Sequence, residues 1–178
     1  LPISGRLRTL VGVAEHPQNR PVLDASGRRV QRGYGILQPR LSPPLPTAGV
    51  QTPWQWLFAG QRGIDPYSAM SSDAYQDLFD EGSFTGKGLL HVATLHAVLG
   101  DRLPTEQVLS HDLLEGALVR CAVVSDVTLI EADPEHSDAD AARQHRWMRG
   151  DWQLLPFLWQ HRCWPLGAIN RWKLLDNL

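Results

Sequence analysis

Patterns typical of β-strands are scarce in this chain, and longer helical patterns separate them. At most three or four short strands can be placed, the clearest over residues 29–41 and 123–131. Apolar residues at helical spacing recur over 5–15, 66–79, 89–99, 110–121 and 138–155. Because strands alternate with helices, we expect an α/β architecture. So few strands predict only part of a nucleotide-binding sheet.

The charge balance and the cysteine content argue against several classes of protein. The net charge of −2 argues against nucleic-acid binding through a broad basic field. Two cysteines, Cys121 and Cys163, do not make a disulfide framework, and we expect reduced thiols. The seven histidines show no zinc-binding spacing, so no metal site is predicted. No run approaches the ~20 apolar residues that cross a bilayer.

Ten residues of a predicted helix, 143–152, combine arginine, glutamine, histidine and tryptophan. Guanidinium groups form paired hydrogen bonds to phosphate oxygens, and indole rings offer flat apolar faces to sugars. A nucleotide-sugar reaction needs both. Helical spacing places Arg143, Arg146 and Trp147 on one face, with Gly150 expected to leave room for a ligand. The alternative is an exposed basic face with Trp147 anchored in the core.

One motif in this helix resembles that of a family of enzymes. Gln144-His145-Arg146-Trp147 is similar to the Q-x-x-R-W motif of processive, inverting glycosyltransferases such as cellulose, chitin and hyaluronan synthases. One residue fewer separates the glutamine from the arginine here. The family spacing would put Arg143 at the first position, so either Arg143 or Gln144 can fill the glutamine's role.

Further motifs, in one order along the chain, resemble the cyclic β-1,2-glucan synthases. They are Gly33-Tyr34-Gly35-Ile36-Leu37-Gln38-Pro39-Arg40, Gly63-Ile64-Asp65-Pro66-Tyr67, Tyr75-Gln76-Asp77-Leu78-Phe79, Glu81-Gly82-Ser83-Phe84-Thr85-Gly86-Lys87-Gly88 and Leu109-Ser110-His111-Asp112-Leu113-Leu114-Glu115-Gly116. The resemblance implies an incomplete GT-A (Rossmann-like) glycosyltransferase domain, of which residues 1–151 form the helix-rich C-terminal, acceptor-side half. Residues 152–178 are then an amphipathic aromatic segment. Since the chain starts at Leu1-Pro2 without Met, we expect a cut edge there.

Asp112 is the candidate general base, because an inverting transfer must remove a proton from the acceptor hydroxyl. It lies just inside a predicted helix start, with Ser110 as the expected N-cap, where the helix N-terminus stabilises an ionised carboxylate. Glu115, on a similar face, is the rival. The alternative for Asp112 is a role in the first helical turn alone. His111 is a candidate supporting residue.

The resemblance also implies substrate-binding roles for other residues. Arg146 would contact the pyrophosphate and Trp147 the terminal glucose of the acceptor. In the glycine-rich loop (residues 81–88), Gly86 permits close backbone approach, and Lys87 could reach a phosphate or a sugar hydroxyl. The spacing in this loop is not that of a phosphate-binding P-loop, and a purely structural turn is the alternative.

The expected cofactor is Mg²⁺ or Mn²⁺, bound by an Asp-x-Asp motif that the resemblance places before Leu1. Asp138-Ala139-Asp140 is the one such spacing in the chain. We interpret it as the solvated start of a helix rather than as a metal site.

The last segment, 152–178, is rich in tryptophan with basic neighbours. Met148, Trp152, Leu155 and Trp159 form a helical stripe. This combination suits a headgroup interface, with ordinary core packing as the alternative. By the resemblance, transmembrane helices of the parent protein flank this segment.

The resemblance implies an enzyme at the cytoplasmic face of a bacterial inner membrane. The parent would transfer glucose from UDP-glucose to a growing β-1,2-glucan with inversion, and we expect the isolated chain to be inactive. Its partners would be UDP-glucose, the β-glucan acceptor and the membrane, with no nucleic acid. Two alternatives remain, a non-catalytic sugar-binding or interaction module and a synthase of another β-glucan.

Overall fold

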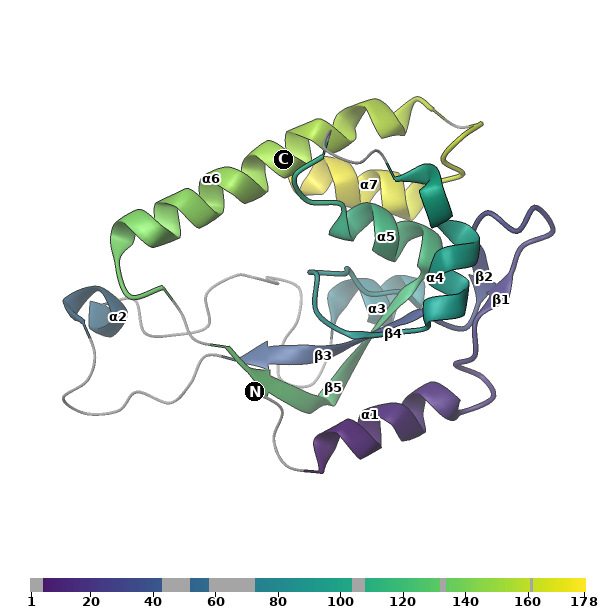
Figure 1. Ribbon diagram of the computed structural model, residues 1–178, viewed down its shortest axis with the longest axis horizontal. Helices are drawn as coiled ribbons and strands as arrows, with labels where there is room; N and C mark the ends of the chain where they lie inside the picture. Colours follow the sequence, from purple (N-terminus) through teal and green to yellow (C-terminus); the bar gives the residue numbers. More distant parts are fainter. Residues whose placement is uncertain (1–4, 43–51, 58–72, 104–107, 132–133, 161) are drawn as a thin grey trace.

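The computed structural model describes residues 5–42, 52–57, 73–103, 108–131, 134–160 and 162–178 (Figure 1). The described part is mixed α/β, with small sheets and seven α-helices. In chain order the elements are α1 (Arg6–Glu15), β1 (Val22–Leu23), β2 (Val30–Arg32), β3 (Ile36–Ser42), α2 (Pro53–Leu57), α3 (Ala74–Phe79), β4 (Leu89–Leu90), α4 (Val92–Val98), η1 (Gly100–Arg102), α5 (Asp112–Val119), β5 (Cys121–Ile130), α6 (Ser137–Leu154), η2 (Leu155–Leu158) and α7 (Ala168–Asp176).

The larger sheet has three strands in the order β4-β3-β5. β3 runs parallel to β5 and antiparallel to the two residues of β4. β1 and β2 form a separate antiparallel pair. The prediction of an α/β architecture with few strands is therefore confirmed. The more specific prediction of half a GT-A domain stays a prediction.

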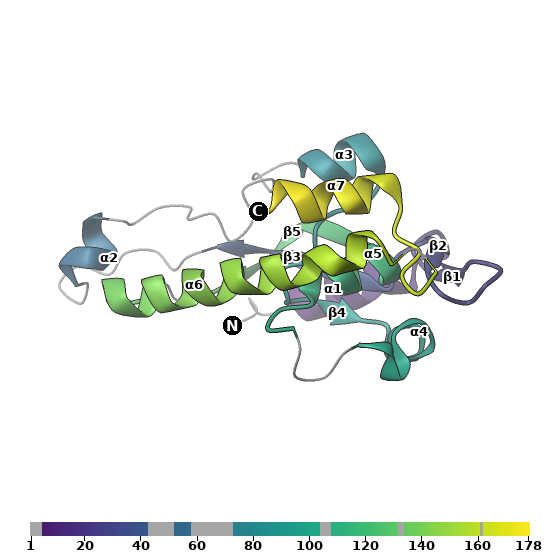
Figure 2. The ribbon, with the colours of Figure 1, turned by 90° about the horizontal axis from the view of Figure 1, so that it is seen from above.

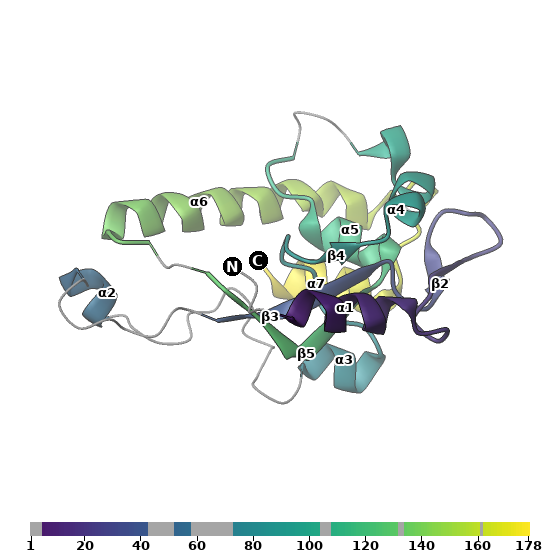
Figure 3. The same ribbon diagram turned by 60° about the horizontal axis from the view of Figure 1, so that its bottom comes forward.

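Helices cover both faces of the larger sheet. Side chains alternate along a strand, so Ile36 and Leu37 point to opposite faces. Ile36 joins a core cluster with Leu114 of α5, Leu154 at the end of α6 and Leu174 of α7. Leu37 packs in a second cluster with Leu10 of α1 and with residues of β5. The molecule is thus layered, with α1 on one face of the sheet and α5 and α7 on the other (Figure 3).

Pro39 lies in the central strand rather than at the edge or terminus that its type predicts. β4 pairs only with Ile36 and Leu37, so no strand on that side needs the amide hydrogen that proline lacks. On the other side, the pairing with β5 shifts register between Pro39 and Arg40. The central strand therefore accommodates a proline, a residue that usually occurs in edge strands or at strand ends.

Most predicted helices are present, with adjusted boundaries. Stretches 5–15 and 138–155 correspond to α1 and α6. The stretch 89–99 begins with β4 and becomes helical at Val92. Residues 58–72, which include the first half of the helix expected over 66–79, lie outside the described residues; its second half contains α3. No helix in the described part of the chain is long and apolar enough to cross a membrane.

Residues 152–178 contain both core and exposed apolar side chains. The boundary drawn after residue 151 falls inside α6. Phe157, Trp164 and Leu174 are buried in the core cluster that also contains α5. The outward-facing members of this segment include Trp152, Trp159 and Trp172, which are 58%, 70% and 56% exposed. The segment therefore completes the core and also presents an aromatic surface.

Candidate active site

Asp112 is the first residue of α5 and is partly exposed. His111, not Ser110, occupies the N-cap position, so the expected cap was wrong. The Ser110 hydroxyl instead donates a hydrogen bond of 3.1 Å to Oδ2 of Asp112. This bond orients the carboxylate at the helix N-terminus, where the helix dipole favours negative charge.

The glycine-rich loop approaches the Asp112 carboxylate directly. Gly86 has a φ of +90°, and a Cβ atom built there would lie 2.8 Å from Oδ2 of Asp112. Only glycine combines this backbone conformation with room for the carboxylate. The sequence prediction that Gly86 permits close approach to a site is therefore consistent with the geometry, and the group it approaches is Asp112.

Two further glycines hold neighbouring segments close to the start of α5. A Cβ at Gly116 of α5 would lie 2.7 Å from Cβ of Phe84 in the loop. A Cβ at Gly150 of α6 would lie 3.0 Å from Cβ of Ser110 and 3.1 Å from its backbone nitrogen. We refer to Asp112, Gly86, Gly116 and Gly150, with the segments they join, as the α5 junction. Gly150 was expected to leave room for a ligand, and this was wrong, because the protein's own backbone fills that space.

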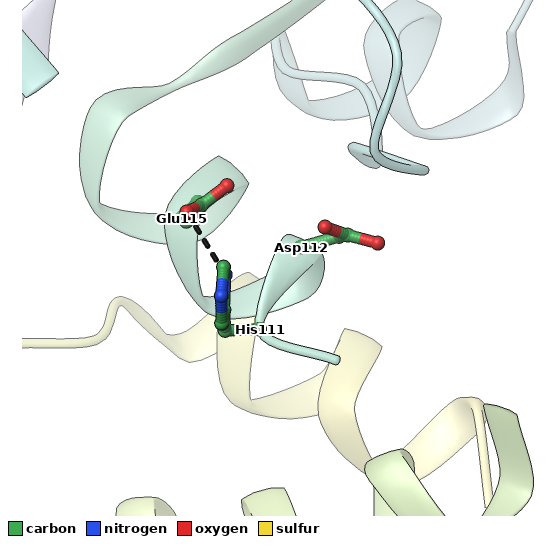
Figure 4. A group of neighbouring side chains, drawn as sticks. All are labelled: His111, Asp112 and Glu115. Carbon is green, nitrogen blue, oxygen red and sulfur yellow. Dashed lines mark ion pairs between the residues drawn. The ribbon is translucent and has the colours of Figure 1, made fainter. Parts of the chain in front are cut away.

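Glu115 and His111 form an ion pair beside Asp112. His111 Nδ1 lies 2.9 Å from Glu115 Oε1. Figure 4 shows the Asp112 carboxylate turned away from this pair. Burial raises the pKa of the Glu115 carboxyl above its ordinary value; His111 opposes this effect and the charge on Asp112 adds to it. The two carboxylates thus have different environments. Glu115 is paired with His111, whereas the Asp112 carboxylate points away from that pair.

A third carboxyl group belongs to the same junction. Asp151 follows Gly150 on α6, and burial raises the pKa of its carboxyl group, an effect that the negative charge on Asp112 increases. A hydrogen bond with Asn177 acts in the opposite direction. Nearby, the backbone N–H of Leu109 donates to Oε1 of Gln153 at 2.8 Å, which ties the segment before α5 to α6.

The basic face of α6 (Arg143, Arg146 and Trp147) lies farther along the same helix. Arg146 is exposed, and the Arg143 guanidinium lies 4.9 Å from the centre of the Trp147 ring. At ~1.5 Å of rise per residue, Arg146 is about one turn and Arg143 about two turns before Gly150. The view in Figure 2 shows α6 lying along the long axis of the molecule, with its end beside α5 and its start projecting away from it.

Arg143 and Gln144, the two candidates for one motif position, both bind the same buried carboxylate. Asp140 accepts hydrogen bonds from Nη2 of Arg143 at 2.8 Å and from Nε2 of Gln144 at 2.9 Å. Asp140 is only 4% exposed. The helix start expected at Asp138-Ala139-Asp140 is confirmed, but Asp140 is buried and paired rather than solvated.

Lys87 points to a different part of the sheet. Its ammonium group forms an ion pair with Glu131, which directly follows β5. The structure therefore brings Gly86 and His111 to Asp112, and places Lys87 and the basic face of α6 in separate surroundings.

Comparison with known proteins supplies the family context. The chain is 49% identical, over 95% of its length, to the cyclic β-(1,2)-glucan synthase NdvB of Rhizobium meliloti. The resemblance to cyclic β-1,2-glucan synthases is confirmed. The chain covers 6% of the length of that synthase. No family model matches the chain.

Some groups at the α5 junction were not predicted to contribute to the site. Gly116 lies against Phe84 of the glycine-rich loop, and the charge of Asp112 acts on Asp151. Gln38 accepts a hydrogen bond from the backbone N–H of Thr85, the residue before Gly86. Gln38 is a polar residue that follows the apolar Ile36 and Leu37 and precedes a proline. This pattern could have indicated that its side chain has a specific buried partner. Gly116 and Asp151 carry no comparable signal, because their roles depend on which segments pack together.

Proposed function

We propose that this chain forms the acceptor side of an inverting glucosyltransferase, with Asp112 as the general base. The observation that carries the proposal is the position of the Asp112 carboxylate. It is partly exposed at the start of α5, oriented by Ser110 and faced by the backbone of Gly86. The similarity to a cyclic β-(1,2)-glucan synthase supports glucose transfer as the reaction.

The reaction is a single displacement at the anomeric carbon of the donor glucose, which we take to be carried by UDP. The acceptor hydroxyl oxygen forms the new glycosidic bond, and the bond from the anomeric carbon to the phosphate oxygen breaks. Asp112 accepts the proton of the hydroxyl, and UDP leaves with the electron pair. The product is a growing β-1,2-glucan. Glu115 is less suited to this role because its carboxylate is engaged by His111 at 2.9 Å.

The basic face of α6 supports binding of the leaving group. Arg146 is exposed and thus available to the pyrophosphate, and Trp147 offers an indole face to the acceptor glucose. Arg143 and Gln144 hold Asp140 and so stabilise the turn from which Arg146 and Trp147 project. Gly86 shapes the acceptor side. Lys87 has a partner in Glu131, so a phosphate would have to displace that carboxylate.

The Mg²⁺ or Mn²⁺ expected for such a donor does not fit the described residues. Among them, His111, Asp112 and Glu115 bring potential ligand atoms within 4.8 Å of one another. In this group the imidazole nitrogen and the Glu115 carboxylate are bound to each other, and Asp112 is assigned to the acceptor. We therefore propose that the cation is bound by residues other than these three.

The exposed aromatic surface supports a membrane partner. Met148, Trp152, Trp159 and Trp172 are each more than half exposed. Indole rings with basic neighbours favour the headgroup region of a bilayer. We propose that this surface contacts the cytoplasmic face of a bacterial inner membrane or flanking membrane helices of the full protein.

The proposal is tested with labelled UDP-glucose and membranes that contain the full protein. We expect label in 2-linked glucose, and loss of this product in the Asp112→Asn variant while UDP-glucose still binds. The purified chain alone is expected to show no transfer. Binding of glucan that is unaffected by Asp112→Asn, without any transfer, would identify a sugar-binding module instead. Another linkage in the product would indicate a different β-glucan synthase.

A further inference from the structure

Gln38 is a buried polar residue on the central strand of the larger sheet, and its side chain binds the glycine-rich loop. It is only 2% exposed. Its Nε2 donates to the carbonyl oxygen of Ser83 at 2.9 Å. Its Oε1 accepts from the backbone N–H of Thr85 at 2.7 Å and from the hydroxyl of Thr85 at 3.0 Å. Both ends of the amide are therefore used to hold the loop.

These hydrogen bonds act immediately before the residue that faces Asp112. Thr85 precedes Gly86, whose backbone lies against the Asp112 carboxylate. Phe84, between the two bonded residues, is buried and packs against Gly116 of α5. Loss of the Gln38 amide would leave the Ser83 carbonyl and the Thr85 N–H without these partners, which is unfavourable for polar groups that are buried or partly buried. The loop would then relax to satisfy these groups elsewhere.

We propose that Gln38 is a positioning residue for the reaction, and that it acts through the loop to fix Gly86 against the general base. This inference rests on the proposed function of Asp112. The loop forms one wall beside the carboxylate, so its displacement changes where the acceptor hydroxyl can lie relative to the base. A misplacement on the order of 1 Å can cost about 100-fold in rate. Gln38 itself need not touch the substrate.

Gln76 supplies a matched control with the same chemistry in a different place. Its Nε2 donates to the carbonyl oxygen of Val123 at 3.0 Å, and the N–H of Val123 donates to its Oε1 at 2.5 Å. Gln76 thus joins α3 to β5 through a pair of backbone hydrogen bonds, as Gln38 joins β3 to the loop. Both Gln76→Met and Gln38→Met remove a pair of hydrogen bonds to the backbone, and Gln38→Met also removes the bond from the Thr85 hydroxyl. Only Gln38→Met releases residues 83–85.

The experiment measures glucose transfer from labelled UDP-glucose in membranes that contain the full protein. For Gln38→Met we expect kcat to fall by about 10- to 100-fold, with the KM for UDP-glucose changed by less than about threefold. The pH profile of kcat should also shift, because the surroundings of the base change. For Gln76→Met we expect kcat within about threefold of the native value. Equal effects of the two substitutions would overturn the inference.

A second pair of variants keeps the inference testable if Gln38→Met does not accumulate in the membrane. Thr85→Val removes only the hydroxyl bond to Gln38, whereas Thr85→Ser retains it. We expect Thr85→Val to lower kcat and Thr85→Ser to keep the native value; equal rates would contradict the role of Gln38. Asp112→Asn separates the two proposals. If Asp112→Asn retains glucose transfer, the proposed function is refuted. If Asp112→Asn loses transfer but Gln38→Met and Gln76→Met have equal effects, the proposed function stands and the positioning role of Gln38 is refuted.

Discussion

The C-terminal end and the middle of α6 have different surroundings. At its end, Gly150 packs against Ser110 and Asp151 interacts with Asp112, so this part of the helix belongs to the α5 junction. In the middle of the helix, Arg146 is exposed, while Arg143 and Gln144 bind Asp140 one turn earlier on the same helix. The proposed base is therefore held by tertiary contacts, and the proposed phosphate-binding face by contacts within one helix.

This difference separates two kinds of expected effects. Substitutions at the α5 junction should change both stability and the geometry of the base, because segments distant in sequence meet there. Substitutions on the exposed part of the basic face should change substrate binding and transfer while the fold persists. The following variants test that distinction, from the largest expected effect to the smallest.

Gly86→Ala should have the largest effect. The added Cβ would meet the Asp112 carboxylate at 2.8 Å, and the φ of +90° is strained for alanine. We expect transfer to fall by about 100-fold, because the carboxylate or the loop must move. Gly27→Ala is the control, since its φ is +68° but no atom lies within 4 Å of the added Cβ. Similar loss of transfer in both variants would show that backbone strain, not contact with Asp112, is responsible.

Arg146→Ala should lower transfer by about 10- to 100-fold, the value of one or two hydrogen bonds to a charged group. Its side chain is exposed, so the unfolding temperature should stay close to that of the native protein. The measurements are steady-state transfer and thermal unfolding of the same preparations. Arg8→Ala, also exposed but on α1 across the sheet, should leave transfer unchanged. A large loss of stability in Arg146→Ala would contradict the distinction between the middle and the C-terminal end of α6.

Gly116→Ala should destabilise the chain by about 1–2 kcal/mol, measured by urea unfolding. Overpacking lowers the free energy of unfolding by about 1–3 kcal/mol. The higher helix propensity of alanine offsets up to about 1 kcal/mol of this loss. The overpacking arises because the new Cβ would lie 2.7 Å from Cβ of Phe84. Gly12→Ala in α1, with no atom within 4 Å, should stabilise the chain instead. The same sign for both variants would argue against close packing at the α5 junction.

Glu115→Gln should change the pH dependence of stability, with the smallest effect of the series. Burial raises the pKa of Glu115 above its ordinary value of 4.5, so the folded protein binds this proton more tightly than the unfolded chain. The resulting stabilisation is present at low pH and is lost as the pH rises through the raised pKa. Glutamine does not titrate, so the variant should lose less stability over that rise. Parallel stability curves for the two proteins would be inconsistent with a raised pKa.

The sequence was sufficient to predict α1, α5 and α6, with boundaries within about two residues. α6 carries a long helical pattern, and apolar residues at helical spacing over 110–121 predicted the helix that the structure shows as α5. The resemblance to glucan synthases supplied Asp112, Gly86 and the basic face as candidate site residues, and these stay predictions. These features are local, so a single stretch of sequence contains the information.

The packing around these residues could not be predicted from the same patterns. A glycine on a helix can leave space for a ligand or for another segment, and at Gly150 that segment is Ser110. The Asp140 carboxylate was expected to be exposed to solvent. It is buried instead, and it accepts hydrogen bonds from Arg143 and Gln144. Gln38 is 45 residues from Ser83, and only the fold brings them together.

The most direct test of the central claim compares Asp112→Asn with Glu115→Gln in membranes that contain the full protein. Initial rates of glucose transfer from labelled UDP-glucose are measured together with the binding of UDP-glucose. The account predicts that Asp112→Asn abolishes transfer with donor binding intact, and that Glu115→Gln retains most of the native rate. Undiminished transfer in Asp112→Asn, or its loss in Glu115→Gln alone, would remove Asp112 as the base and assign that role to Glu115 or to another residue.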